Sequence, residues 1–181
     1  MDAYQAEEVL READCLYTND QIQSALEVMA ARITEKLKNQ NPLVLCVMTG
    51  AIIPAGHLLT RLNFPMQIDY IHATRYRGET SGSHLQWLVR PSHSLKGRNL
   101  LIIDDIYDEG VTLAEIADYC SAEGAAEIYL AVLVNKLHNR KHPLKVDFIG
   151  VETPDRYLFG YGMDYKDYLR NAPGIYAVKG M

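Results

Sequence analysis

The stretch LLIIDDIYDEGVT, residues 100–112, decides the fold class of this chain of 181 residues. It begins with four aliphatic residues, and a short apolar run of this kind is typical of a buried strand. The carboxylates that follow this run are Asp104, Asp105, Asp108 and Glu109. Gly110 then marks a tight turn into a helix that is predicted to begin near Thr112. A strand that passes through a short loop into a helix is typical of α/β proteins.

The same alternation of strands and helices extends over most of the chain. Short apolar runs predict strands at residues 43–48, 68–73, 100–103, 128–134 and 146–151. Helical patterns fall between several of them, notably at residues 54–62 and 112–123. This order implies an α/β fold with a mostly parallel twisted sheet flanked by helices. We expect one domain of this class over residues 1–181.

Residues 1–40 are expected to be helical. The apolar side chains that recur there at three- and four-residue spacing are Ile22, Leu26, Met29, Ile33 and Leu37. Thr18 and Gln21 have the spacing of a capping box, in which each side chain binds the backbone N–H of the other residue. The pattern predicts a helix with one buried face.

Composition excludes several classes of protein. A chain with 48% hydrophobic residues and a net charge of −5 can enclose a core but offers no basic face for nucleic acid. Cys15, Cys46 and Cys120 are widely spaced, which indicates neither a disulfide framework nor a zinc site, so all three are interpreted as reduced thiols. No signal peptide or membrane helix is evident, since no apolar run approaches roughly 20 residues. We expect a cytoplasmic protein with no membrane partner.

The carboxylates suggest a ligand. Open parallel sheets bind ligands beyond the carboxyl ends of their strands. Asp104 and Asp105 are expected at the fraying end of a strand, where their oxygens can accept hydrogen bonds from sugar hydroxyls or bind a metal. The turn at Gly110 aims backbone N–H groups and the positive end of a helix at one point, which suits a phosphate. The two halves together predict a site for a sugar phosphate.

The segment TRYRGETSGSH, residues 74–84, is long and polar, and it is predicted to be a mobile functional loop. When this loop closes, Arg75 is expected to bring a positive charge, and Tyr76 together with it is expected to shield the bound sugar phosphate from water.

The stretch from residue 100 to residue 113 resembles the phosphoribosyl-diphosphate signature of type I phosphoribosyltransferases, and residues 43–170 resemble the hypoxanthine-guanine members of that family. The resemblance implies a small hood formed by the terminal segments. Residues 1–40 would contribute to the hood, residues 41–151 would form the core, and residues 152–181 would form the purine-binding and C-terminal segment. It further implies Mg²⁺, a homodimer or homotetramer, and two substrates: 5-phosphoribosyl 1-diphosphate and a 6-oxopurine.

On this resemblance, Asp104 and Asp105 match the acidic pair that binds the ribose hydroxyls and Mg²⁺, and Asp108 matches the general base. The residues matched to the 5′-phosphate loop are Asp108, Glu109, Gly110, Val111 and Thr112. The residues assigned to the diphosphate are Thr49, Gly50, Arg75, Tyr76 and Arg170. In the family, an unusual cis peptide occurs where Met48 and Thr49 stand here.

Lys136 matches the lysine that contacts the purine O6, Tyr157 the aromatic residue that stacks on the base, and Leu158 the residue whose backbone binds the base edge. Asp164 matches a magnesium-linked aspartate beside the purine. The chemistry of Lys136 supports its role independently, because an ammonium only donates hydrogen bonds and so favours a 6-oxo over a 6-amino group. The six histidines lack metal-ligand spacing and are interpreted as structural or solvated.

Three positions depart from the commoner residues of the family. Thr49 replaces a frequent lysine or arginine, Arg75 replaces a serine, and Glu109 replaces a serine or threonine. A carboxylate cannot donate a hydrogen bond to a phosphate and repels it, so the side chain of Glu109 is expected to point outward.

These features predict a magnesium-dependent purine salvage transferase that makes IMP or GMP and diphosphate. One alternative is a phosphoribosyltransferase that prefers xanthine, because the residues around Tyr157 do not settle how purine position 2 is recognised. The other is a regulator on the same fold that senses nucleotides or binds RNA.

Overall fold

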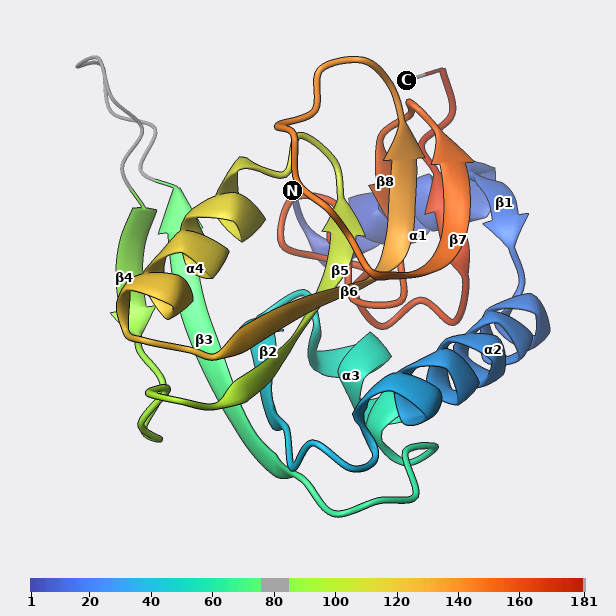
Figure 1. Cartoon of the computed structure of the whole chain (residues 1–181). Coiled ribbons are helices and arrows are strands. Elements are labelled where there is room, and N and C mark those ends of the chain that lie inside the picture. Colours follow the sequence, from blue (N-terminus) through green and yellow to red (C-terminus); the bar gives the residue numbers. More distant parts are fainter. Residues whose placement is uncertain (76–84, 181) are drawn as a thin grey trace.

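The computed structural model describes residues 1–75 and 85–180, and it contains a six-stranded sheet with strand order β4-β3-β2-β5-β6-β7 (Figure 1). The strands are β2 (Leu43–Met48), β3 (Gln67–Arg75), β4 (Leu85–Val89), β5 (Asn99–Tyr107), β6 (Glu127–Leu137) and β7 (Phe148–Pro154). Five of them run parallel, and β4 pairs antiparallel with β3 at one edge. The predicted α/β class with a mostly parallel sheet is confirmed.

Helices lie on both faces of this sheet. The helices are α1 (Ala3–Glu12), α2 (Asn19–Leu37), α3 (Ile52–Leu59) and α4 (Val111–Ala122). The chain crosses from β2 through α3 to β3 in one direction and from β5 through α4 to β6 in the other. Because such crossovers are right-handed, the two directions place α3 and α4 on opposite faces. Helix α2 packs against α3 and β7 (Figure 1).

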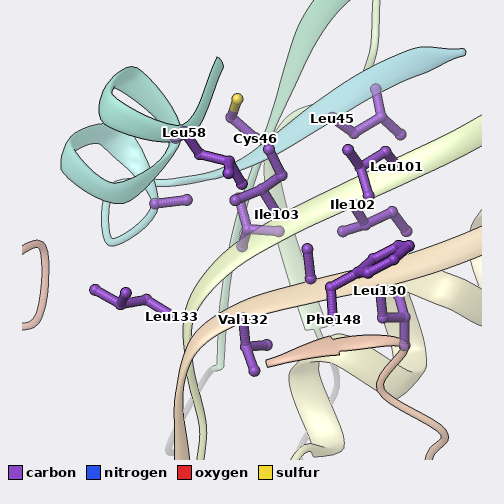
Figure 2. Close-up of a cluster of buried hydrophobic side chains, with 14 of the residues drawn as sticks. Leu45, Cys46, Leu58, Leu101, Ile102, Ile103, Leu130, Val132, Leu133 and Phe148 are labelled. Carbon is purple, nitrogen blue, oxygen red and sulfur yellow. The ribbon is translucent and has the colours of Figure 1, made fainter. Parts of the chain in front are cut away.

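The central strands are buried on both faces, as expected for a parallel sheet between helices. Figure 2 shows Leu45, Leu101 and Ile102 of adjacent strands packed side by side with Leu130 and Phe148. These residues are almost fully buried. The core therefore runs across β2, β5, β6 and β7 and gives a rigid base to the loops at the carboxyl ends of the strands.

The helical prediction for residues 1–40 is correct for α2 and wrong between the two helices. Thr18 caps α2 as predicted, because its Oγ1 accepts the N–H of Gln21 at 3.4 Å while Gln21 Oε1 accepts the N–H of Thr18 at 2.9 Å. A strand, β1 (Asp14–Tyr17), separates α1 from α2. It pairs with β9 (Ile175–Ala177), a partner far along the chain that local periodicity cannot reveal.

A second sheet joins the two ends of the chain. Its strand order is β1-β9-β8, with β8 at Leu158–Phe159. A separate hydrophobic cluster supports it, formed by Phe159, Tyr165, Ala172 and Val178. The segment between β7 and β9 thus carries side chains near the carboxyl ends of the main strands (Figure 1).

Strand β5 continues beyond its predicted end at residue 103. Asp104 pairs with Val132 and Tyr107 with Asn135 in the β5–β6 ladder, so Asp104 and Asp105 lie inside the strand. The expectation that both acids occupy a fraying end was wrong, because backbone partners on β6 extend the strand through them. Asp105 is only 8% exposed.

None of the helices in residues 1–75 and 85–180 is long and apolar enough to cross a membrane. The three cysteines are free thiols, with Cys15 exposed and Cys46 and Cys120 buried. Burial raises the pKa of Cys46 to about 11 and, together with the charge of Glu123, that of Cys120 to about 12. Both buried thiols are therefore inert packing groups.

Candidate functional site

A cavity of about 610 Å³ opens where β2 and β5 end. Chain crossovers leave these two neighbouring strands in opposite directions, and parallel sheets bind ligands at such a switch point. The predicted site residues that line it are Thr49, Gly50, Asp104, Asp105, Asp108, Glu109, Gly110, Thr112 and Arg170. Val111 begins α4 beside them. The backbone of Arg75 ends β3, whereas Tyr76 and the rest of the predicted mobile loop lie outside the described residues.

The loop after β2 packs tightly against Asp105. The Met48–Thr49 peptide is cis, as the resemblance implied. A Cβ on Gly50 would lie 2.2 Å from Asp105 Oδ2, and a Cβ on Gly162 would lie 2.1 Å from the Gly50 carbonyl oxygen. Glycine is therefore required at position 50, because any side chain there would displace the Asp105 carboxylate.

Asp104 and Asp105 are adjacent acids that both line the larger cavity. Asp104 Oδ1 accepts the backbone N–H of Asp105 at 2.9 Å. Burial raises the pKa of both carboxyls, and the neighbouring charge of Asp105 adds to this effect at Asp104. The positive charge of Arg170 partly offsets the rise at Asp105. The carboxylates of half-buried Asp104 and buried Asp105, which both line the larger cavity, make an oxygen donor set that suits Mg²⁺.

The turn into α4 has the geometry expected of an anion site. Gly110 has a φ of 78°, a conformation that favours glycine, and a Cβ there would lie 2.1 Å from the Tyr107 ring. The N-terminal N–H groups of α4 follow directly. Glu109 is exposed, and its carbonyl oxygen accepts the N–H of His142 at 2.8 Å. The outward direction of the Glu109 side chain stays a prediction.

A second cavity, of about 240 Å³, adjoins the first. The predicted purine residues that line it are Lys136, Tyr157, Leu158 and Asp164. Asp105, Ile106 and Asp108 line both cavities. Asp108 is therefore placed to act on two ligands at once, one in each cavity.

Asp108 binds two side chains of the segment that ends β6. Lys136 Nζ donates to its Oδ2 at 3.0 Å, and His138 Nε2 lies 2.6 Å from its Oδ1. Burial alone would raise the pKa of Asp108, but these two partners outweigh it and lower the pKa below its ordinary value. Asp108 is thus an anion that is held on both oxygens.

A family model for a phosphoribosyl transferase domain matches residues 12–167. The chain belongs to the phosphoribosyl transferase family. It is 31% identical over 165 residues to the hypoxanthine-guanine-xanthine phosphoribosyltransferase of Tritrichomonas foetus, an alignment that covers 91% of this chain and 90% of the relative. It is 30% identical to the hypoxanthine-guanine phosphoribosyltransferase of Bacillus subtilis, with 91% and 92% covered.

The solved structures agree with this assignment. The hypoxanthine phosphoribosyltransferase of Trypanosoma cruzi in complex with IMP aligns with a TM-score of 0.86 at 28% identity, over 93% of this chain and 95% of that one. The resemblance to type I phosphoribosyltransferases inferred from the sequence is confirmed.

In this phosphoribosyl transferase, the remaining predicted residues connect the two cavities. Arg170 Nη2 forms an ion pair with Asp164 Oδ1 at 2.7 Å, and Arg170 Nη1 donates to the Gly162 carbonyl oxygen at 2.7 Å. Asp164 lines the smaller cavity and Arg170 the larger one. Tyr157 is 45% exposed, and its ring forms a T-shaped pair with the ring of Tyr165, with 5.3 Å between the ring centroids. One face of the smaller cavity is thus aromatic.

Two residues of this phosphoribosyl transferase site were missed in the sequence. His138, whose side chain is 5% exposed, contacts Asp108, and Asp155 Oδ1 lies 3.2 Å from Lys136 Nζ. Arg140 Nη2 in turn pairs with Asp155 Oδ2 at 2.8 Å. Histidine spacing could not reveal the first contact because a single histidine carries no pattern. Its position two residues after Lys136 was the available signal.

Proposed function

We propose that this enzyme is a purine salvage transferase that joins hypoxanthine or guanine to 5-phosphoribosyl 1-diphosphate, releasing diphosphate and forming IMP or GMP. The observation that carries the proposal is the position of Asp108 on the border of two cavities, with Lys136 Nζ 3.0 Å away. One cavity has the donors for a sugar phosphate, and the other has the aromatic and cationic groups for a 6-oxopurine.

The larger cavity receives the sugar phosphate. The 5′-phosphate binds the turn from Asp108 to Thr112, whose N–H groups point to one place at the start of α4. The ribose hydroxyls donate to Asp104 and Asp105. Thr49, Gly50 and Arg170 receive the diphosphate, together with Arg75 at the end of β3 and Tyr76. Arg170 supplies positive charge there without Lys or Arg at position 49.

The cofactor is Mg²⁺, held by Asp104 and Asp105 with Asp164 linked to the same site. The fit rests on the donor chemistry, since carboxylate oxygens suit this ion and Asp104 and Asp105 both line the larger cavity. The bound ion supplies charge neutralisation to the diphosphate leaving group. Arg170, which binds Asp164, keeps that carboxylate near the larger cavity.

The smaller cavity receives the purine. Lys136 Nζ donates to O6, and Asp108 Oδ2, 3.0 Å from that nitrogen, accepts the proton of the neighbouring N7. Tyr157 stacks on the base, and the backbone of Leu158 binds its edge. The small sheet β1-β9-β8 carries Leu158 and forms the hood, with residues 41–151 as core and residues 152–181 closing the purine side.

The test is a purine competition assay. Purified protein, Mg²⁺ and 5-phosphoribosyl 1-diphosphate are mixed with equal hypoxanthine, guanine, xanthine and adenine, and nucleotide products are separated. We expect IMP and GMP, loss of product with a chelator, and no AMP. Absence of product from every purine would reject the enzyme in favour of the regulator on this fold.

Xanthine is a second candidate substrate with specific support. A relative that is 31% identical carries xanthine in its name, so XMP among the products would place this enzyme with a xanthine-using group. We further propose that the enzyme acts in the cytoplasm as a homodimer or homotetramer. Analytical sedimentation measures this oligomeric state.

A further inference from the structure

His138 follows directly after β6, and its ring contacts Asp108, which lines both cavities. The side chain is 5% exposed, so water does not compete for its ring nitrogens. The residues that the family resemblance assigned do not include it.

The hydrogen bonds of the ring define which nitrogen carries the hydrogen. The backbone N–H of Arg140 points at His138 Nδ1 at 3.1 Å. An amide nitrogen can only donate, so Nδ1 accepts and has no hydrogen of its own. Nε2 therefore carries the hydrogen and donates it to Asp108 Oδ1 at 2.6 Å.

The Asp108 carboxylate is consequently fixed at both oxygens. His138 holds Oδ1 from the segment after β6, while Lys136 holds Oδ2 from within β6. Because each oxygen accepts from a different donor, the carboxylate is held in a single rotamer. In this rotamer Oδ2 lies beside Lys136, the lysine proposed to face the purine. We infer that His138 is a positioning residue that holds Asp108 in the orientation needed to take the purine proton. The inference rests on the proposed function and deepens it.

A metal ion held by Asp108, His138 and Asp155 fits the structure less well than a positioning role for His138. Asp108, His138 and Asp155 offer ligand atoms within 4.8 Å of one another. The Lys136 ammonium already binds both carboxylates, at 3.0 and 3.2 Å, and Arg140 binds Asp155 at 2.8 Å. These cations occupy the oxygens that a metal ion would need.

The test compares His138→Ala and His138→Gln with wild type and with His142→Ala. Gln places an uncharged N–H donor near the position of Nε2, whereas Ala removes the donor. His142 is the matched control, because it lies in the same segment, is exposed, and contributes main-chain atoms to the bonds with Glu109 and Tyr107.

We expect His138→Ala to lower kcat by about tenfold to a hundredfold, the scale of a small misplacement of a catalytic group, with the KM for 5-phosphoribosyl 1-diphosphate nearly unchanged. His138→Gln should restore most of kcat, and His142→Ala should match wild type. The acid limb of the kcat profile should move to higher pH in His138→Ala and return in His138→Gln. Among residues 1–75 and 85–180, the charged groups around Asp108 include Lys136, which donates to it, Lys141, which interacts with its charge, Asp155, which shares Lys136 with it, and Asp105, which lines the same cavity.

A kcat for His138→Ala within about twofold of wild type would overturn the inference, as would a His138→Gln variant as slow as the Ala variant. Nitrogen NMR of the wild-type histidines gives a readout that needs no turnover. Hydrogen on Nε2 and a bare Nδ1 at His138 support the inference, and the reverse tautomer overturns it. An inactive wild type rejects the proposed function alone, because the tautomer still decides the role of His138.

Discussion

Lys136 Nζ lies 3.0 Å from Asp108 Oδ2, where Lys136 lies in β6 and Asp108 directly follows the end of the neighbouring parallel strand β5. The pair places a donor and an acceptor side by side at the spacing of O6 and N7 on a purine. Lys136 is 9% exposed and also binds Asp155, so its position is set before a ligand arrives. Substitution of Asp108 and substitution of Lys136 should therefore affect different steps, catalysis in one case and purine binding in the other.

Asp108→Asn keeps the shape of the side chain and removes the proton acceptor. We expect kcat to fall by roughly a hundredfold or more, the usual scale for loss of a general base. The KM values should change less, and single-turnover measurement should locate the loss in the chemical step. Near-normal turnover would assign the proton to another group.

Lys136→Ala removes the proposed donor to O6. We expect purine affinity to fall by roughly tenfold to a hundredfold, which corresponds to about 1.5 to 3 kcal/mol for a hydrogen bond to a charged donor. Binding of 5-phosphoribosyl 1-diphosphate, titrated by calorimetry, should remain nearly unchanged. Equal losses for both substrates would contradict the placement of Lys136 in the purine cavity alone.

Gly50→Ala should damage the diphosphate side of the site, because the new Cβ would lie 2.2 Å from Asp105 Oδ2. We expect the KM for 5-phosphoribosyl 1-diphosphate to rise by up to about a hundredfold, the effect of a displacement of roughly 1 Å. Gly56→Ala is the matched control, since no atom lies within 4 Å of a Cβ there and the residue is helical. It should leave KM unchanged and stabilise the fold by about 0.5 to 1 kcal/mol. A normal KM in Gly50→Ala would show that the loop moves freely.

The acid stability of the protein should depend on Asp69, far from the site chemistry. Its Oδ2 accepts the N–H groups of Ser92 and His93 at 2.8 and 2.9 Å, and the His93 ring lies 2.8 Å away. Burial alone would raise the pKa of Asp69, but these bonds outweigh it and hold the pKa well below 3.8. The stabilisation is therefore complete above the ordinary value of 3.8 and is lost as the pH falls below it.

Asp69→Asn should lower the free energy of unfolding by about 1.5 to 3 kcal/mol at neutral pH, the scale of a bond to a charged group. The difference from wild type should shrink in urea melts at about pH 3, where the unfolded wild-type chain is protonated. A constant difference across this range would mean that the Asp69 charge contributes nothing.

The central sheet could be predicted because its strands are local apolar runs. The strand predicted at residues 43–48 is observed at Leu43–Met48, and α4 is shifted by one residue from residues 112–123. The strands β1, β8 and β9 have 4, 2 and 3 residues, which is too short for any periodic pattern. Their partners are distant in sequence, so only tertiary pairing makes them strands.

The candidate site also contains residues that a local sequence pattern reveals and a residue that only tertiary structure reveals. Asp104, Asp105 and Asp108 could be found because one short stretch of sequence concentrates them within and directly after a single strand. His138 lies 30 residues from Asp108 and is brought to it by the parallel register of β5 and β6. A contact of this kind has no local sequence pattern, because it depends on where the two strands end relative to each other.

The last prediction concerns Glu109, the one carboxylate of the opening stretch whose side chain has no proposed contact with a ligand. Its backbone belongs to the phosphate turn, and its side chain repels a phosphate and cannot donate to it. Glu109→Thr adds a hydroxyl donor, so we expect 5-phosphoribosyl 1-diphosphate to bind up to about tenfold more tightly, or about 1.4 kcal/mol, with little change for the purine. Calorimetric titration measures the affinity for each of the two substrates. Weaker binding of the sugar phosphate would instead make Glu109 a positive participant, acting through a cation in the closed site.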